Sequence, residues 1–147
     1  MYVKAQTTQE GFLLPHATRV IPLAGVNSIY TITGGPIRII QITGTVSVIM
    51  GGGPNLTKLQ IHPTGQTAVD LCTTVDISTL IVGQLVGLPG PIASALQTGW
   101  VIGQQSQRLI VTPGTIDVNC AAAAGTGAFT WALLWLPMIP GAFCQAI

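Results

Sequence analysis

Charged side chains are scarce in this sequence. Among its 147 residues are five Lys or Arg and four Asp or Glu, so 6% are charged, against about 25% in ordinary soluble proteins. The basic residues stand singly, as at Arg38, Lys58 and Arg108, and the formal net charge is only +1. Proteins that bind nucleic acid gather basic side chains into a patch that neutralises a row of phosphates. The sequence therefore predicts no direct contact with nucleic acid.

Residue types that carry chemistry are equally rare. The two histidines, His16 and His62, lie far apart, and neither has a second histidine at the spacing that zinc sites use. A nucleophilic site needs Ser or Cys beside a His and an orienting acid. The nearest such group, around His62, Asp70 and Cys72, is explained more simply as a strand end, a loop and a buried thiol. We predict no enzymatic activity, no metal and no cofactor.

The cysteines and the N-terminal segment bear on the cellular compartment. Cys72, Cys120 and Cys144 cannot all pair within one chain and have no CxxC spacing, which argues against a disulfide scaffold and a zinc knuckle. The longest apolar stretch near the start, residues 12–14, is ended by Pro15 and is too short for a signal peptide. We therefore expect synthesis in a reducing cytoplasm without export.

A long uncharged segment, residues 120–144, raises the question of a membrane span. Glycines and prolines interrupt it, and no Lys or Arg flanks it. Its large apolar side chains recur with the period of two that a strand has, and not with the 3.6 of a helix. These side chains are Phe129, Trp131, Leu133 and Trp135. The segment is therefore predicted to be a buried strand, with no membrane as partner.

What the sequence does contain is a β pattern. Hydrophobic residues make up 48% of the chain, which excludes a disordered protein, and 18 glycines and 10 prolines supply turns and argue against long helices. We predict an all-β fold, an antiparallel β-sandwich of about eight strands, jelly-roll-like or of a related Greek-key type. Residues 1–18 are expected to form an extended N-terminal arm and residues 19–147 a single domain. The predicted strands are Ser28–Thr33, Ile37–Met50, Leu56–His62, Val75–Val82, Gly99–Ile102, Gln107–Val111, Thr115–Cys120 and Ala128–Leu136, after a first candidate at Arg19–Leu23.

The longest predicted strand, Ile37–Met50, has two different faces. Alternate residues of a strand share a side, and here one side is aliphatic while the other consists mostly of short, uncharged polar groups. The predicted core face comprises Ile40, Ile42, Val46, Val48 and Met50, and the opposite face Ile39, Gln41, Thr43, Thr45, Ser47 and Ile49. A polar face without charge suits contact with another subunit.

The same strand is expected to bend and to fold back on the next one. Gly44 in its middle predicts a bend or bulge. The turn GGGPN then predicts a hairpin with Leu56–His62, in which Gln60 faces outward. In the strand Thr115–Cys120 the alternation likewise places Asp117 outward.

Five stretches carry a resemblance that covers nearly the whole chain after residue 18. They are YTITGGPIRIIQITGTV (30–46), NLTKLQIHPT (55–64), TAVDLCTTVDIS (67–78), GTIDVNCAAAAGTGAFTWALLWLPM (114–138) and PGAFCQAI (140–147). Within their β pattern, VDLC is followed by DI, and GTI is followed by C, by GT and by the tryptophans before a proline. This pattern resembles short virion proteins of tailed bacteriophages. Among these the chain is most similar to β-sandwich capsid decoration (cement) proteins.

The resemblance implies a non-enzymatic virion protein, made in the host cytoplasm, that binds the outside of an assembled capsid as a symmetric oligomer and stabilises the shell. Assembly is favoured because subunits around a closed axis bury uncharged faces against one another. The resemblance implies a homotrimer, since a three-fold axis is common among short β-sandwich virion proteins. The partners are then further copies of the chain and the major capsid protein or another virion protein. The candidate interface residues are Phe12, Leu13, Leu14, Gln41, Thr43, Thr45, Trp100, Trp135 and Phe143.

Two other functions stay open. A tail, baseplate or fibre component could have the same type of fold. A carbohydrate-binding β-sandwich module would instead expose Trp100, Trp131 and Trp135 as a platform on which sugar rings stack.

Overall fold

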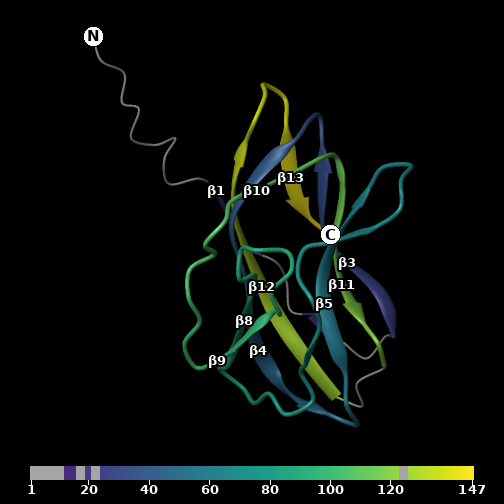
Figure 1. Cartoon of the computed structure of the whole chain (residues 1–147), viewed down its shortest axis with the longest axis vertical. Coiled ribbons are helices and arrows are strands. Elements are labelled where there is room, and N and C mark those ends of the chain that lie inside the picture. The colour runs from purple at the N-terminus through teal and green to yellow at the C-terminus, as the bar shows by residue number, and fades with distance from the viewer. Residues whose placement is uncertain (1–11, 16–18, 21–23, 123–125) are drawn as a thin grey trace.

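Two antiparallel sheets pack face to face around one hydrophobic core (Figure 1). This computed structural model describes residues 12–15, 19–20, 24–122 and 126–147. Thirteen strands and no helix lie in these ranges, so the prediction of an all-β, antiparallel β-sandwich is confirmed. The jelly-roll connectivity stays a prediction, and residues 1–11 and 16–18 of the predicted arm lie outside the described residues.

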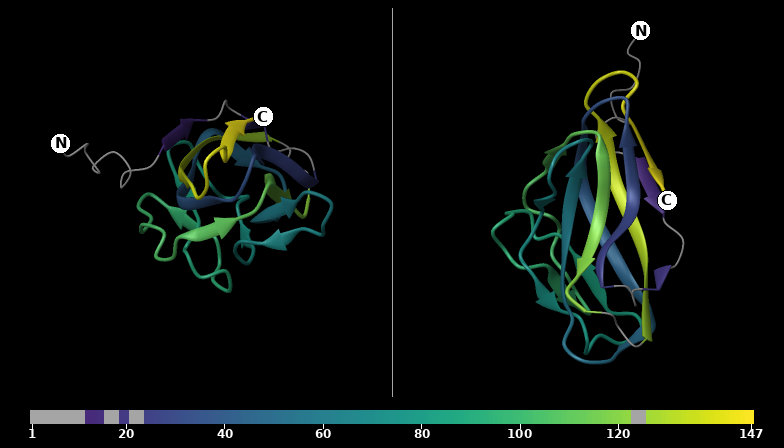
Figure 2. Two further views of the ribbon diagram at one scale, coloured as in Figure 1. Left: turned by 90° about the horizontal axis from the view of Figure 1, so that it is seen from above. Right: turned by 90° about the vertical axis from the view of Figure 1, so that its right-hand side faces the viewer.

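Each sheet has long central strands flanked by short ones (Figure 2). Sheet A has the order β1 (Phe12–Pro15), β12 (Thr126–Pro137), β4 (Ile37–Gly51), β8 (Leu85–Gly87) and β9 (Gln97–Gly99), with β2 (Arg19–Val20) also on β12 and β10 (Leu109–Val111) also on β4. Sheet B has the order β13 (Phe143–Ala146), β3 (Gly25–Thr33), β11 (Gly114–Cys120), β5 (Leu56–Pro63) and β6 (Val69–Asp70), with β7 (Val75–Asp76) also on β5.

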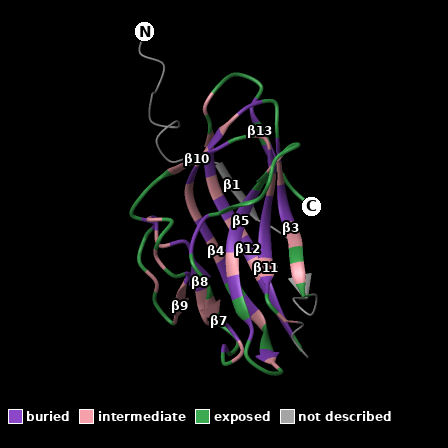
Figure 3. Ribbon diagram, turned by 45° about the vertical axis from the view of Figure 1, so that its right-hand side comes forward, coloured by how far each residue is buried: buried purple, intermediate pink, exposed green. Residues whose placement is uncertain are grey.

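The core lies between the sheets, and its largest side chains come from the strands with the clearest alternation (Figure 3). On β12 the aromatic face predicted from the sequence is buried, with Phe129, Trp131 and Leu133 at most 1% exposed. Phe129 and Trp131 pack against each other with ring centroids 5.4 Å apart. The uncharged C-terminal segment is thus a strand, as predicted, and none of the described residues forms a helix long and apolar enough to cross a membrane.

The predicted hairpin between β4 and β5 is wrong, because the two strands belong to different sheets. β4 pairs with β12 on one side and with β8 and β10 on the other, so neither edge is left for β5. The turn GGGPN instead carries the chain from sheet A to sheet B. Asn55, at its end, is buried, and its backbone N–H donates to the Asp76 carboxylate at 2.9 Å.

The predicted faces of β4 are correct in its middle and at Met50, which is 5% exposed. Ile42 and Val46 are buried, but Ile39 is buried while Ile40 is half-buried, and Val48 is exposed. The pairing with β12 shifts register beside Ile40 and again near Val48, and an extra residue at each shift reverses the alternation.

No bulge lies at Gly44, since the register runs without interruption from Thr43 to Thr45. The glycine instead makes room for a neighbour. A Cβ at this position would lie 2.8 Å from Cγ2 of Val86 and 2.9 Å from Cζ3 of Trp131.

Several shorter predictions also need correction. The strand expected at Val75–Val82 ends at Asp76, after which the chain forms turns, and the strand expected at Gly99–Ile102 lies at Gln97–Gly99. Gln60 and Asp117, expected to face solvent, are buried. They lie opposite each other on the paired strands β5 and β11, and the pairing of β11 with β3 shifts register at Asp117, which breaks the simple alternation there.

Candidate binding surfaces

Exposed apolar side chains lie near the end of β4, in the turn that runs back along it after β7, and directly after β9. We call this group the apolar edge. It consists of Val48, Ile49, Ile81, Val82, Trp100 and Val101. Trp100 is 62% exposed and Val101 87% exposed. Neighbouring exposed apolar side chains often mark an interaction surface.

The backbone explains how the apolar edge is assembled. After β7 the chain turns back along β4, where Met50 N donates to Leu80 O at 3.0 Å and Gly83 N donates to Val46 O at 2.9 Å. This brings Ile81 and Val82 beside the exposed end of β4. The indole of Trp100 lies over Gly83, where a Cβ would be 3.3 Å from Cζ3 of the ring.

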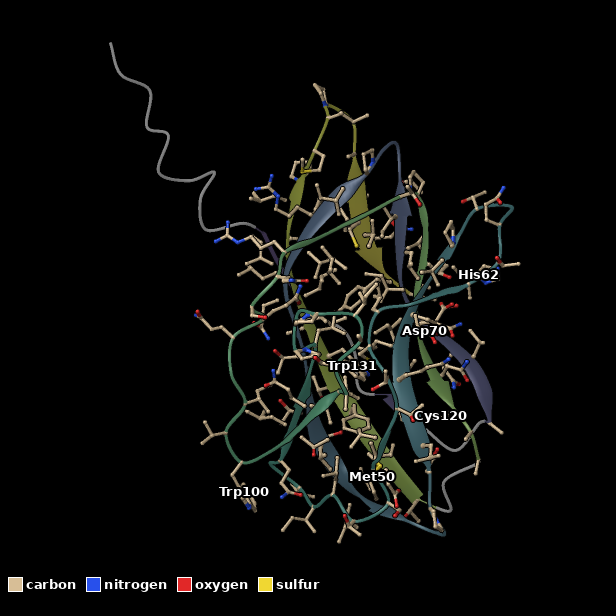
Figure 4. The ribbon with its side chains drawn as sticks, viewed as in Figure 1. Met50, His62, Asp70, Trp100, Cys120 and Trp131 are labelled. Carbon is tan, nitrogen blue, oxygen red and sulfur yellow. The ribbon has the colours of Figure 1, made fainter. Side chains whose placement is uncertain are left out.

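The three tryptophans lie in different surroundings (Figure 4). Trp100 is at the periphery of the molecule and Trp131 is in its interior. Trp135 is only 6% exposed, and its ring meets Phe143 edge to face with centroids 6.4 Å apart. A stacking platform built from all three tryptophans is therefore not present.

The polar face predicted on β4 is partly covered. Thr45 is exposed, but Gln41 and Thr43 are half-buried beneath the segment that follows β9. In this segment the backbone N–H of Gln105 donates to Oε1 of Gln41 at 2.7 Å. Of the predicted interface residues on β4, Thr45 is therefore the one that faces solvent most fully.

The remaining predicted interface residues lie at the edges of the two sheets. Phe12, Leu13 and Leu14 belong to β1 and pair with residues 133–135 of β12. Phe143, on the edge strand β13, is 53% exposed.

Charge is as sparse on the surface as in the sequence. Among the described residues the ion pair is Lys58 with Asp70, whose Nζ and Oδ2 atoms are 2.7 Å apart. Asp76 accepts backbone N–H groups of Asn55 and Ser78, each at 2.9 Å, and these bonds hold the pKa of its carboxyl below the usual value. Asp117 is fully buried, and neither of its carboxylate oxygens has a hydrogen-bond partner in the described part of the chain.

The thiols have no arrangement that would make them reactive. All three cysteines are unpaired and buried, and burial raises the pKa of each thiol, that of Cys144 to about 12. A reactive cysteine has the opposite character, a lowered pKa and access to solvent. Within the described ranges no three His, Cys, Asp or Glu side chains are grouped as a metal site would need.

Sequence reasoning nominated Trp100 but missed most of the apolar edge. The sequence predicts that Ile81 and Val82 end the strand Val75–Val82, whereas the structure places them in the turns after Asp76. The glycine that follows, Gly83, and the absence of alternation are the signals that indicate an exposed turn here and not a buried strand.

Comparison of the chain with protein-family models, with curated proteins and with solved structures finds no match.

Proposed function

We propose that this chain is a structural virion protein that assembles as a symmetric oligomer, binds the outside of an assembled phage capsid and stabilises the shell. The observation that carries the proposal is the apolar edge, which lies on a surface with almost no charge. Such a surface favours association over solubility as a monomer. The resemblance of the sequence to capsid decoration proteins is the reason for proposing that the oligomer is part of a virion.

The occupant proposed for the apolar edge is a second copy of the chain. Burial of apolar surface contributes about 25 cal/mol per Å², and a large exposed tryptophan is the residue type that dominates many interfaces. Trp100 and Val101 together provide such an anchor. Closed symmetry would cover the apolar edge of every subunit, and a three-fold axis is the arrangement we favour.

Stabilisation of the shell follows from mass action. A protein that binds only the assembled shell lowers the free energy of that state by its own binding free energy. An oligomer that engages several shell subunits at once multiplies this effect through avidity. No catalytic group is needed, in keeping with the scarcity of titratable side chains.

Light scattering on the purified protein tests the self-association. We expect a stable oligomer at micromolar concentration, and a smaller species for the double variant Trp100→Gln, Val101→Gln. The matched control is Val26→Gln, which changes an exposed valine on β3 of the other sheet and should leave the mass unchanged. A monomeric native protein contradicts the proposed oligomer.

Co-sedimentation with emptied or expanded phage shells tests the location. Binding to shells, and a higher temperature of shell disruption, are the expected results. Absence from the shell pellet together with binding to purified tails would contradict decoration and favour the tail, baseplate or fibre alternative.

A further inference from the structure

A second apolar surface lies where β10 of sheet A and β6 of sheet B come together. It is a groove with a volume of about 310 Å³, and we call it the β10 groove. Residues of β10, β5, β6 and the segment between β8 and β9 line it. Its apolar lining includes Ile61, Val69, Leu71, Ile92, Ile110 and Val111.

The β10 groove has a buried floor and an exposed apolar rim. Ile61, Leu71 and Val111 belong to the hydrophobic core and are buried. The other three of these side chains, from β6, β10 and the segment between β8 and β9, are each more than half exposed. Exposed apolar side chains around a concave surface are typical of a binding site.

The charges around the groove suit an uncharged partner. The lining includes one charged residue, Asp70, whose carboxylate is neutralised by Nζ of Lys58 at 2.7 Å. The apolar edge has no charged member, and residues 77–107, which supply most of it, contain no Asp, Glu, Lys or Arg. Contact between the apolar edge and the β10 groove would therefore bury no unpaired charge.

A three-fold ring, which we favour for the proposed oligomer, requires two different surfaces on each subunit. In such a ring one patch of a subunit contacts a different patch of the next, whereas a two-fold dimer uses the same patch twice. The apolar edge and the β10 groove are two such patches. Trp100 and Asp70, which lines the groove, lie far apart in Figure 4, so Trp100 cannot fill the groove of its own chain.

The size of the groove matches a tryptophan. Trp100 is the largest exposed apolar side chain among the described residues. An apolar cavity of about 150 Å³, roughly half the volume of the β10 groove, holds a benzene molecule, so an indole ring has room. A docked tryptophan buries about 150–250 Å², and a stable interface buries about 800 Å² on each partner. The flanking side chains, Ile81 and Val82 on one surface and Val69 and Ile92 on the other, would contribute to the rest.

We propose that Trp100 of one subunit inserts into the β10 groove of the next, so that the apolar edge and the groove together form the interface of a closed ring. This inference rests on the proposed self-association and adds the surface to which the apolar edge binds.

Two variants that each remove one surface test the pairing. The edge variant is Trp100→Gln, Val101→Gln, and the groove variant is Ile92→Gln, Ile110→Gln; all four side chains are more than half exposed, so the fold should be retained. Light scattering should find each variant monomeric, because each lacks one half of every contact in the ring. Phe143→Gln is the control, since it changes an exposed aromatic residue on β13 outside both surfaces and should keep the native mass.

Mixing the two variants should restore one contact. The groove of the edge variant is intact and can receive Trp100 of the groove variant, so an equimolar mixture should form a species of two chains. Its formation should need a higher concentration than the native oligomer does, because a single contact lacks the closure of a ring. A groove variant with the native mass, or a mixture that stays monomeric, overturns the proposal.

Cross-linking identifies the partner surface directly. In the native-size oligomer of the variant Trp100→p-benzoyl-phenylalanine, irradiation should link position 100 to residues 69–71, 92 or 109–111 of another subunit. Mixing isotope-labelled and unlabelled chains separates links between subunits from links within one. Links to residues 81–82 or 100–101 of another subunit would show that two apolar edges meet around a two-fold axis, and would overturn the proposal. A monomeric native protein contradicts the self-association itself, whereas an oligomer linked outside the groove contradicts only this pairing.

Discussion

Gly44 of β4 lies directly opposite Trp131 of β12, and the indole ring occupies the space that a side chain at position 44 would need. Trp131 is 1% exposed and is the largest fully buried side chain of the core. The glycine is therefore required for packing, on a strand whose other core positions are filled by isoleucine, valine and methionine.

Replacing Gly44→Ala should lower the free energy of unfolding by about 1–3 kcal/mol, because the added methyl overpacks the contact with Trp131 and Val86. Urea denaturation measures the change. Gly53→Ala is the control, since a Cβ there meets nothing within 4 Å, and it should be close to neutral. Combining Gly44→Ala with Trp131→Phe should cost less than the sum of the single changes, and strict additivity would contradict the contact.

Asp117→Asn should raise the free energy of unfolding by about 1 kcal/mol or more, because it removes a buried carboxylate that has no bonding partner in the described structure. The substitution keeps the size of the side chain. Asp70→Asn is the comparison, since it breaks the partly exposed pair with Lys58 and should lower stability by at most about 1 kcal/mol. A loss of stability in Asp117→Asn would show that the charge has a stabilising partner.

The thiols of Cys72, Cys120 and Cys144 should stay unmodified in the folded protein. Each is buried, and burial raises each pKa, so the thiolate that alkylating reagents need is scarce at neutral pH. Mass spectrometry after a short pulse of iodoacetamide should find no label without denaturant and three labels in urea. Rapid labelling of any one cysteine in the native protein would contradict its buried position.

Asp76 should make stability depend on pH in the acid range. Its backbone hydrogen bonds lower the folded-state pKa below the ordinary 3.8, so the stabilisation is present above that value and is lost as pH falls through the folded pKa. Asp76→Asn should be less stable than the native protein at neutral pH. In urea denaturation the difference should shrink as pH is lowered below 3.8. A difference that stays constant with pH would contradict this origin.

The sequence predicted the fold class and the long strands, because both depend on local information. Alternation on β12 identified its buried face, and glycine and proline marked the turns. Pairing depends on distant segments, so the sequence could not show that β4 pairs with β12 and not with β5. The role of Gly44 was missed for the same reason, since Trp131 belongs to a remote part of the chain.

The candidate surfaces were also predicted only where local sequence carries the information. Trp100 was nominated from its residue type, and its exposure places it in the apolar edge. The segment after β9 covers Gln41 through a contact between distant parts of the chain, which leaves no periodic signal in the sequence. Asp117 is likewise buried next to a register shift in the pairing of β11 with β3, which simple alternation does not predict.

The pairing of β4 with β12 also sets the order in which the chain can fold. β12 is among the last segments to be synthesised, so β4 must wait for nearly the whole chain before its main partner exists. Contacts between such distant segments slow folding, and domains rich in them fold in about milliseconds to seconds. During that interval an apolar strand with two open edges can join strands of other chains. Irregular edges and polar side chains disfavour such pairing, so the register shifts and the uncharged polar side chains of β4 limit aggregation of the newly made chain before β12 has formed.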